Sequence, residues 1–171
     1  MKTKLFLLII TILISQITYA QQSTTDWKSW SWLIGDWVGD GNGKPGDGNG
    51  FFSLKEDLSG KVLIRKAHSE YPATADKPAI IHDDLMTVYP GTDSTSDRAI
   101  YFDNEGHVIN YTVSVSDKSI VLLSEKMPSA PIFRLTYLLI ENGLINIKFE
   151  MSQDGEHFMT YVEGKCKKII N

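Results

Sequence analysis

The chain has 171 residues and a formal charge of −4, with 17 Lys and Arg against 21 Asp and Glu. This balance argues against nucleic acid or an anionic membrane as the main partner, because both attract basic proteins. The single cysteine, Cys166, excludes an intrachain disulfide. We expect it to lie on a strand as a small buried hydrophobe.

The first twenty residues have the pattern of a secretory signal peptide. Lys2 and Lys4 supply the charged start, and Leu5–Ile14 is an apolar run that is too short to span a membrane. Small residues at Thr18 and Ala20 predict cleavage after Ala20. No cysteine follows that point, so a lipoprotein anchor is not expected. The sequence predicts a soluble protein that is periplasmic or secreted, without a membrane anchor.

The next segment, residues 21–34, contains the one helical pattern of the chain. In "DWKSWSWLIG", the apolar residues Trp27, Trp30 and Ile34 recur at helical spacing, and Gly35 follows as a stop signal. We expect a short helix of about two turns that covers one end of the domain formed by residues 35–171.

The remainder of the chain alternates apolar runs with turn signals and shows no βαβ pattern. The expected strands are residues 36–40, 51–58, 61–68, 79–89, 98–102, 107–115, 119–124, 131–140, 144–152 and 157–170. About ten strands joined by short turns predict an all-β fold, a single antiparallel up-and-down barrel. Closure of the barrel removes the exposed edges of a sheet.

One hairpin register follows from the "ENGL" turn. Asn142-Gly143 is typical of a two-residue turn, which would pair Ile140 with Ile145. The same register places Arg134 on the inner, apolar face. The alternative is that Arg134 lies at a strand end and reaches solvent.

Potential metal ligands gather in the hairpin around "EYPATADKPA". One register sets His68 opposite His82, with Asp84 on the same face, and a shift that pairs Arg65 with Asp83 is an alternative. Two imidazoles and a carboxylate suit an open zinc site. The competing interpretation is a salt-bridged hairpin end. Because neither HExxH nor a nucleophile elbow occurs, we expect a non-catalytic protein and keep a metal-dependent enzyme as an alternative.

The run "GDWVGDGNGKPGDGNG" admits three interpretations. Residues 41–46 match GxGxxG, but a strand follows where a dinucleotide site needs a helix. Asp40 and Asp47 begin two fragments of calcium loops whose later positions lack the closing carboxylate. The third interpretation is the first strand of a barrel, in which Trp37 plugs one end and the glycines let the chain bend.

On these residues the chain resembles a known group of barrels. The stretch "LIGDWVGDGNGKPGDGNGFFSLKEDL" resembles the GxWxGxG opening of calycin-type barrels, in particular nitrobindin-like and related lipocalin-like exported domains. The resemblance extends loosely to "HDDLMTVY" and "TYVEGKCKKI". It implies a ten-stranded barrel that holds heme through a histidine of the last strand. Tyr161 stands at that position and His157 lies four residues earlier, so the expected heme ligand is absent, although tyrosine can also ligate heme iron.

The sequence therefore predicts an exported barrel that binds a small, mostly apolar ligand in its interior, such as a lipid or a carboxylate-bearing molecule. By resemblance to fatty-acid-binding barrels, where an interior Arg and a Tyr hold the ligand carboxylate, Arg134 is the candidate anchor. Tyr161 and Trp37 are the other candidate ligand contacts, and heme is an alternative ligand. A barrel packed with its own side chains, serving as a structural or protein-interaction domain, is the alternative function.

Overall fold

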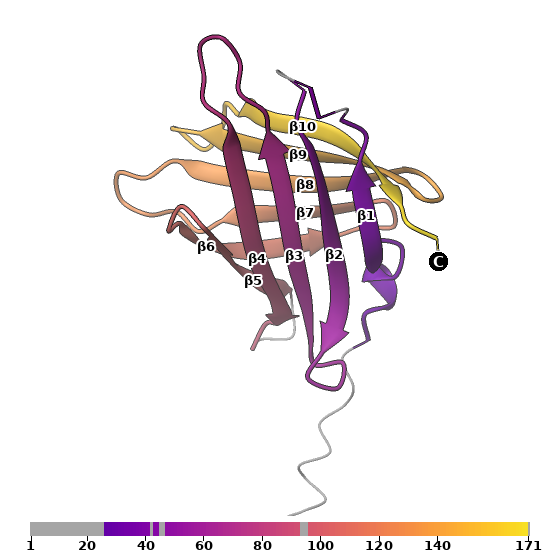
Figure 1. Ribbon diagram of the computed structural model, residues 1–171. Coiled ribbons are helices and arrows are strands. Elements are labelled where there is room, and N and C mark those ends of the chain that lie inside the picture. Colours follow the sequence, from indigo (N-terminus) through magenta and orange to yellow (C-terminus); the bar gives the residue numbers. More distant parts are fainter. Residues whose placement is uncertain (1–25, 42, 45–46, 93–95, 171) are drawn as a thin grey trace, which may run out of the picture.

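A computed structural model describes residues 26–41, 43–44, 47–92 and 96–170. The predicted signal peptide lies outside these residues. The described chain forms a closed barrel of ten antiparallel strands in the order β1-β10-β9-β8-β7-β6-β5-β4-β3-β2, so the predicted all-β barrel is confirmed (Figure 1). The strands are β1 (Gly35–Gly39), β2 (Asn49–Asp57), β3 (Val62–Tyr71), β4 (Ile80–Pro90), β5 (Asp97–Asp103), β6 (Val108–Val115), β7 (Ser119–Ser124), β8 (Ile132–Glu141), β9 (Leu144–Ser152) and β10 (Met159–Lys168).

Alternating burial along the strands produces the two faces of the barrel wall. In β7, Ile120 and Leu122 are fully buried, whereas the next residue, Leu123, is exposed. This period of two is the pattern of a strand with one face on the core. The β8–β9 turn contains Gly143 and the β9–β10 loop contains Gly155, and both glycines take positive φ angles (76° and 84°) that favour a residue without a side chain.

Three apolar side chains seal one end of the barrel, which we call the plugged end. The expected helix is a single 3-10 turn, Lys28–Trp30, and it is the one helical turn among the described residues. Trp30, Leu33 and Trp37 are all fully buried there. The indole N–H of Trp30 donates to Asp97 (2.8 Å), and that of Trp37 donates to the Leu33 carbonyl (2.8 Å). These bonds satisfy the two indoles and fix the plug in the barrel mouth.

Close backbone approach explains much of the glycine-rich run. A Cβ added to Gly41 would lie 1.6 Å from the carbonyl oxygen of Gly48, so the two segments can touch only if residue 41 has no side chain. At Gly35, where φ is +139°, an added Cβ would lie 2.7 Å from the Lys168 side chain. The described part of the run therefore begins in β1 and continues with a close backbone approach between Gly41 and Gly48.

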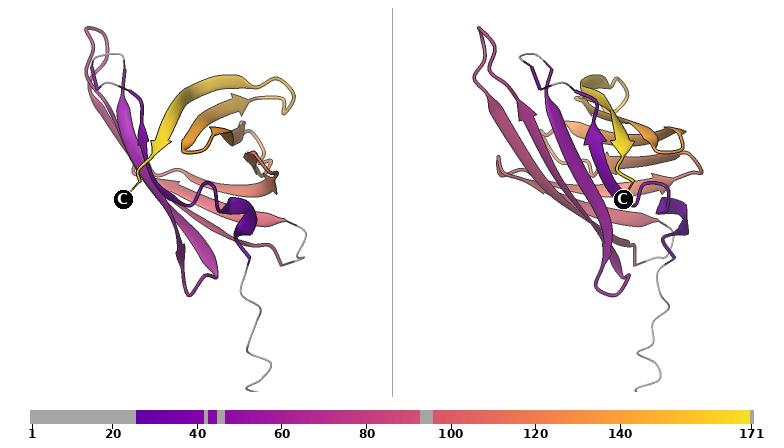
Figure 2. Two further views of the ribbon diagram at one scale, coloured as in Figure 1. Left: turned by 90° about the vertical axis from the view of Figure 1, so that its right-hand side faces the viewer. Right: turned by 45° about the vertical axis from the view of Figure 1, so that its right-hand side comes forward.

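The inner face is filled at the plugged end and exposed at the opposite end, which we call the open end. Buried inner-face side chains of the plugged half include Leu54, Leu63, Val88, Ile120 and Leu122. At the open end, Met159 is 64% exposed and Val162 is 40% exposed. Both belong to the inner wall, because they pair with Met151 and Phe149 of β9. In Figure 2, β10 arches away from the sheet that contains β2 and β3.

The predicted register of the β8–β9 hairpin is wrong by one residue. Leu139 pairs with Ile145, and Arg134 pairs with Glu150. An irregularity between Leu139 and Glu141 shifts the ladder next to the turn, and a one-residue slip moves every side chain to the other face. Arg134 therefore lies on the outer face.

The predicted registers of the β3–β4 hairpin are also wrong. His68 pairs with Asp83, and Ser69 pairs with His82. Leu63 and Val88 determine this register, because it brings these two fully buried side chains together on the inner face. As a result, the outer face carries His68 and the inner face carries His82.

Candidate functional site

A buried ion pair lies on the inner faces of β3 and β4. The guanidinium of Arg65, a residue only 9% exposed, donates to the carboxylate of Asp84. The face of the Phe52 ring lies 5.1 Å from the same guanidinium, which adds a cation–π contact. Burial lowers the pKa of Arg65, but the combined effect of Tyr137 and Asp84 raises it by a larger amount. The net shift of the pKa is therefore upward. Arg65 is thus a permanent buried cation with one counter-ion.

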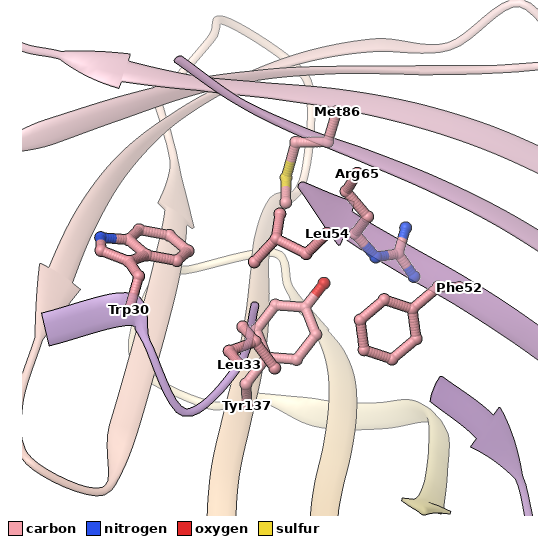
Figure 3. A pocket seen from close by; sticks show the side chains of 7 residues that line it. All are labelled: Trp30, Leu33, Phe52, Leu54, Arg65, Met86 and Tyr137. Atoms are coloured by element: carbon pink, nitrogen blue, oxygen red, sulfur yellow. The ribbon is translucent and has the colours of Figure 1, made fainter. Parts of the chain in front are cut away.

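Two hydrogen-bond donors in this layer have no acceptor. Among the described residues, the buried side-chain atoms without a partner are Nε of Arg65, the hydroxyl of Tyr137 and Nε1 of Trp32. Burial raises the pKa of Tyr137 to about 12, so its hydroxyl keeps its proton. In Figure 3 the hydroxyl end of Tyr137 points to the side of Arg65 and Phe52. The layer therefore holds an N–H and an O–H that lack an acceptor.

The space that Arg65 and Tyr137 help to line is closed. The seven side chains drawn in Figure 3 enclose a space that is too small for a water molecule. A buried donor without a partner costs about 1–3 kcal/mol. The packing is thus complete around Trp30 and Leu33. The Arg65 layer above them still contains two hydrogen-bond donors without an acceptor.

A chain of polar side chains connects this layer with the β5–β6 loop. Nε2 of His82 lies 3.8 Å from Asp84 and 2.9 Å from the Tyr101 hydroxyl, and its Nδ1 lies 3.2 Å from Glu105. Burial raises the pKa of Tyr101. Asp103 accepts from His107, and these bonds lower its pKa although burial opposes the change. The β4–β6 side of the open end is therefore polar.

The three predicted metal ligands do not converge on one point. His68, on the outer face, binds Asp83 (2.7 Å) and Glu70 (3.0 Å), and the two carboxylates raise its pKa, Glu70 most. His82 and Asp84 lie on the inner face. In the part of the chain that the structure describes, no group of three or more His, Cys, Asp and Glu side chains is arranged to hold a metal ion.

Arg134, the predicted carboxylate anchor, is engaged on the outside of the barrel. Its Nε donates to Glu150 (2.7 Å), and its guanidinium lies 3.9 Å from the centre of the Phe158 ring. Arg65 is the arginine of the inner face. The sequence "KVLIRKAH" did not reveal this, because the apolar run Val62-Leu63-Ile64 before Arg65 fits either face.

Trp37 and Tyr161 contact the interior in different ways. Trp37 is buried in the plug and stacks on Phe52 at 6.0 Å, so it supports the ring that faces Arg65. Tyr161 lies at an irregularity in β10, is 71% exposed, and meets the inner-wall ring of Phe149 edge-on at 6.2 Å. Tyr161 is thus mostly in solvent, as the sequence pattern predicted, and keeps one ring contact with the inner wall.

The residues present do not fit a heme held through an axial histidine. β10 contains no histidine, and His157 lies in the preceding loop, where its Nδ1 is 2.7 Å from Asp154. Tyr161 is the remaining candidate ligand of iron, and its ring is largely in solvent. The donor set of the interior, a charged guanidinium and a protonated phenol, suits an oxygen acceptor rather than a metal.

A second concave surface lies on the outside of β1–β3. It is a groove of about 410 Å³ lined by Asp36, Phe51, Ser53, Lys66, His68 and Ile169, among others. It is mostly apolar, and two of its polar side chains are paired on the surface, Asp36 with Lys55 (2.9 Å) and His68 with Asp83 (2.7 Å). Among the described residues, none of the buried donors without an acceptor lines this groove.

No family model matches the chain, and no curated protein matches it. The described residues contain no helix with the length and apolar character needed to cross a membrane. The barrel and its interior are therefore the features that indicate function.

Proposed function

We propose that this protein is an exported, non-catalytic barrel of calycin type that binds a small, mostly apolar ligand with a carboxylate head. One observation carries the proposal. Two buried donors without an acceptor, on Arg65 and Tyr137, lie below an inner wall whose apolar side chains are exposed at the open end. An acceptor on the ligand would remove the cost of both donors, and the apolar wall would cover its tail.

The charges of the layer favour an acid over a neutral head. A carboxylate near Arg65 forms charge-assisted hydrogen bonds, but it also approaches Asp84. Asp84 reduces this gain but does not remove it, because Arg65 still offers an N–H without an acceptor. We therefore expect an acid to bind more tightly than a neutral molecule of the same chain length.

Entry of the head group requires a local rearrangement, since the space beside Tyr137 is closed. Met86 lines it and is fully buried. Methionine has an unbranched, flexible side chain that changes rotamer at small cost. Met86 is therefore the side chain whose movement would admit the ligand head.

Export and family membership are parts of the same proposal. The leader pattern of residues 1–20 supports export, and intact-mass analysis of protein from the periplasm or medium would test for a chain that begins after Ala20. The GxW opening and the ten-stranded closed barrel support a calycin-type, nitrobindin-like or lipocalin-like assignment.

Calorimetric titration with dodecanoate, and with dodecanol as the neutral match, tests the function. We expect dodecanoate to bind with micromolar affinity and dodecanol at least about tenfold more weakly, because a charged acceptor gains more from Arg65. The variant Tyr137→Phe should lose about tenfold in affinity for the acid, and Tyr161→Phe should lose little. If neither amphiphile binds and no ligand co-purifies in native mass spectrometry, the barrel is a packed structural domain.

A further inference from the structure

The barrel wall is closed over only a short distance between its first and last strands. β1 pairs with β10 at three positions, where residues 37–39 face residues 166–168. One more bond joins the Asp40 amide to the Lys165 carbonyl (3.0 Å). Above it, no described segment other than β9 pairs with residues 159–164 of β10. We call this free edge the open seam.

The open seam coincides with the exposed apolar part of the inner wall. Every residue from 159 to 165 is exposed. Met159 and Val162 point inward from this edge, and the Tyr161 ring stands against Phe149. In the left view of Figure 2, β10 diverges from β1 and β2 along this part of its length.

Gly164 keeps the lower part of the seam free of side chains. It pairs with the inner-wall residue Ile147 and stands between Val162 and Cys166, which also face inward. No atom lies within 4 Å of a Cβ added to Gly164, and its φ angle is one that any residue adopts. Ile147 pairs with Gly164 on one side and with Tyr137 on the other, so only one strand separates this open space from Tyr137.

The chemistry of the open end indicates which way an apolar chain would run. His82, Tyr101 and Asp103 form the polar side on β4 and β5. The apolar side is formed by Phe149, Met159 and neighbouring inner-wall residues of β9 and β10. A hydrocarbon chain that leaves the Arg65 layer would bury more apolar surface along β10 than along β4 and β5.

We propose that the wall opens sideways at the open seam, and that the far end of an elongated, single-chain amphiphile leaves the interior there, past Gly164. The inference rests on the proposed function and adds to it the class of ligand. A ligand longer than the interior is accepted because its tail passes out of the barrel at the free edge of β10. Gly164 is then the residue whose lack of a side chain lets such long chains bind.

Chain-length dependence of binding tests the proposal with unbranched C8, C12 and C16 fatty acids as probes. Affinities are measured by calorimetry for the wild type, Gly164→Trp and Ser114→Trp. Ser114 is exposed on the outside of β6, so it adds the same ring away from the seam. We expect wild-type affinity to rise from C8 to C16. Gly164→Trp should bind C8 within about twofold of the wild type and C16 at least about tenfold more weakly, and Ser114→Trp should match the wild type at every length.

Other results would overturn the inference. Equal weakening of C8 and C16 by Gly164→Trp would place its effect on the head-group layer or the fold, and unchanged C16 binding would show that the tail does not pass Gly164. Gly164→Leu, a smaller change, repeats the comparison if the tryptophan variant has a lowered melting temperature. If the wild type binds C8 and C16 with equal affinity, the inference about the open seam is overturned and the proposed function stands. If the wild type binds none of the three fatty acids, both are overturned.

Discussion

The carboxylate of Asp84 is the counter-ion of the buried guanidinium of Arg65, and the two meet on the inner faces of neighbouring strands. Exposed ion pairs contribute little to stability, but breaking a buried pair leaves an uncompensated charge in the interior. Removing one partner of the pair should therefore destabilise the protein strongly, whereas removing both partners should have a much smaller effect.

Asp84→Asn should lower the free energy of unfolding by about 3–5 kcal/mol, because Arg65 then has no counter-ion. The double variant Arg65→Met with Asp84→Leu removes both charges, so it should recover most of the lost stability. Urea unfolding at pH 7 measures both values. A loss below about 1 kcal/mol in the single variant would show that water or another group neutralises Arg65.

Trp37→Ala should destabilise the protein by about 3–5 kcal/mol, because it leaves a cavity in the plugged end. The ring is fully buried, donates to Leu33 and stacks on Phe52. The neighbouring residue Val38 points outward and is largely exposed, so Val38→Ala serves as the control and should change stability by less than about 1 kcal/mol. Similar effects of the two substitutions in thermal unfolding would contradict the role of Trp37 as a plug.

How much the sequence could predict differs between strands and registers. The strands were predictable because their alternation and the turn residues, such as Asn142-Gly143, are local signals. The registers were not, since an irregularity beside that turn reverses the face of every residue in β8. Arg134 was therefore placed inside and Arg65 was overlooked as an interior residue. Which arginine is buried depends on partners that are distant in sequence, here Asp84 and Tyr137.

Cys166 should react slowly with thiol reagents in the folded protein. Burial raises the pKa of its thiol to about 11, with Arg65 opposing the shift and Asp40 adding to it. At pH 8 the reactive thiolate is then rare, and labelling should be at least about 100-fold slower than for an ordinary cysteine thiol. Labelling in concentrated urea gives the reference rate. Equal rates in the folded and unfolded protein would show that the thiol is open to solvent.

Glu150 should make stability depend on pH in the acid range. Arg134 donates to Glu150, and this bond, opposed by burial and assisted by Lys148, lowers the pKa of the carboxyl below its usual value of 4.5. A carboxyl whose pKa is lower in the folded state stabilises the protein above its unfolded pKa, and the contribution is lost as the pH falls through the folded value. Glu150→Gln should therefore cost about 1–3 kcal/mol at pH 7, and the difference from wild type should shrink below pH 4. The exposed Glu141→Gln serves as the control, and a difference that grows on acidification would contradict the assignment.

Tyr137→Phe separates stability from binding. In the free protein the hydroxyl of Tyr137 is buried without a partner, so its removal should leave the unfolding free energy unchanged or raise it by about 1 kcal/mol. The same substitution removes one of the two donors offered to a ligand carboxylate, and affinity for dodecanoate should fall. A residue kept only for packing would show a loss of stability, whereas a binding residue shows the opposite pair of changes. Thermal unfolding and calorimetric titration of one preparation measure both. Loss of stability with unchanged affinity would assign the hydroxyl to a hydrogen bond of the folded core and would remove Tyr137 from the proposed site.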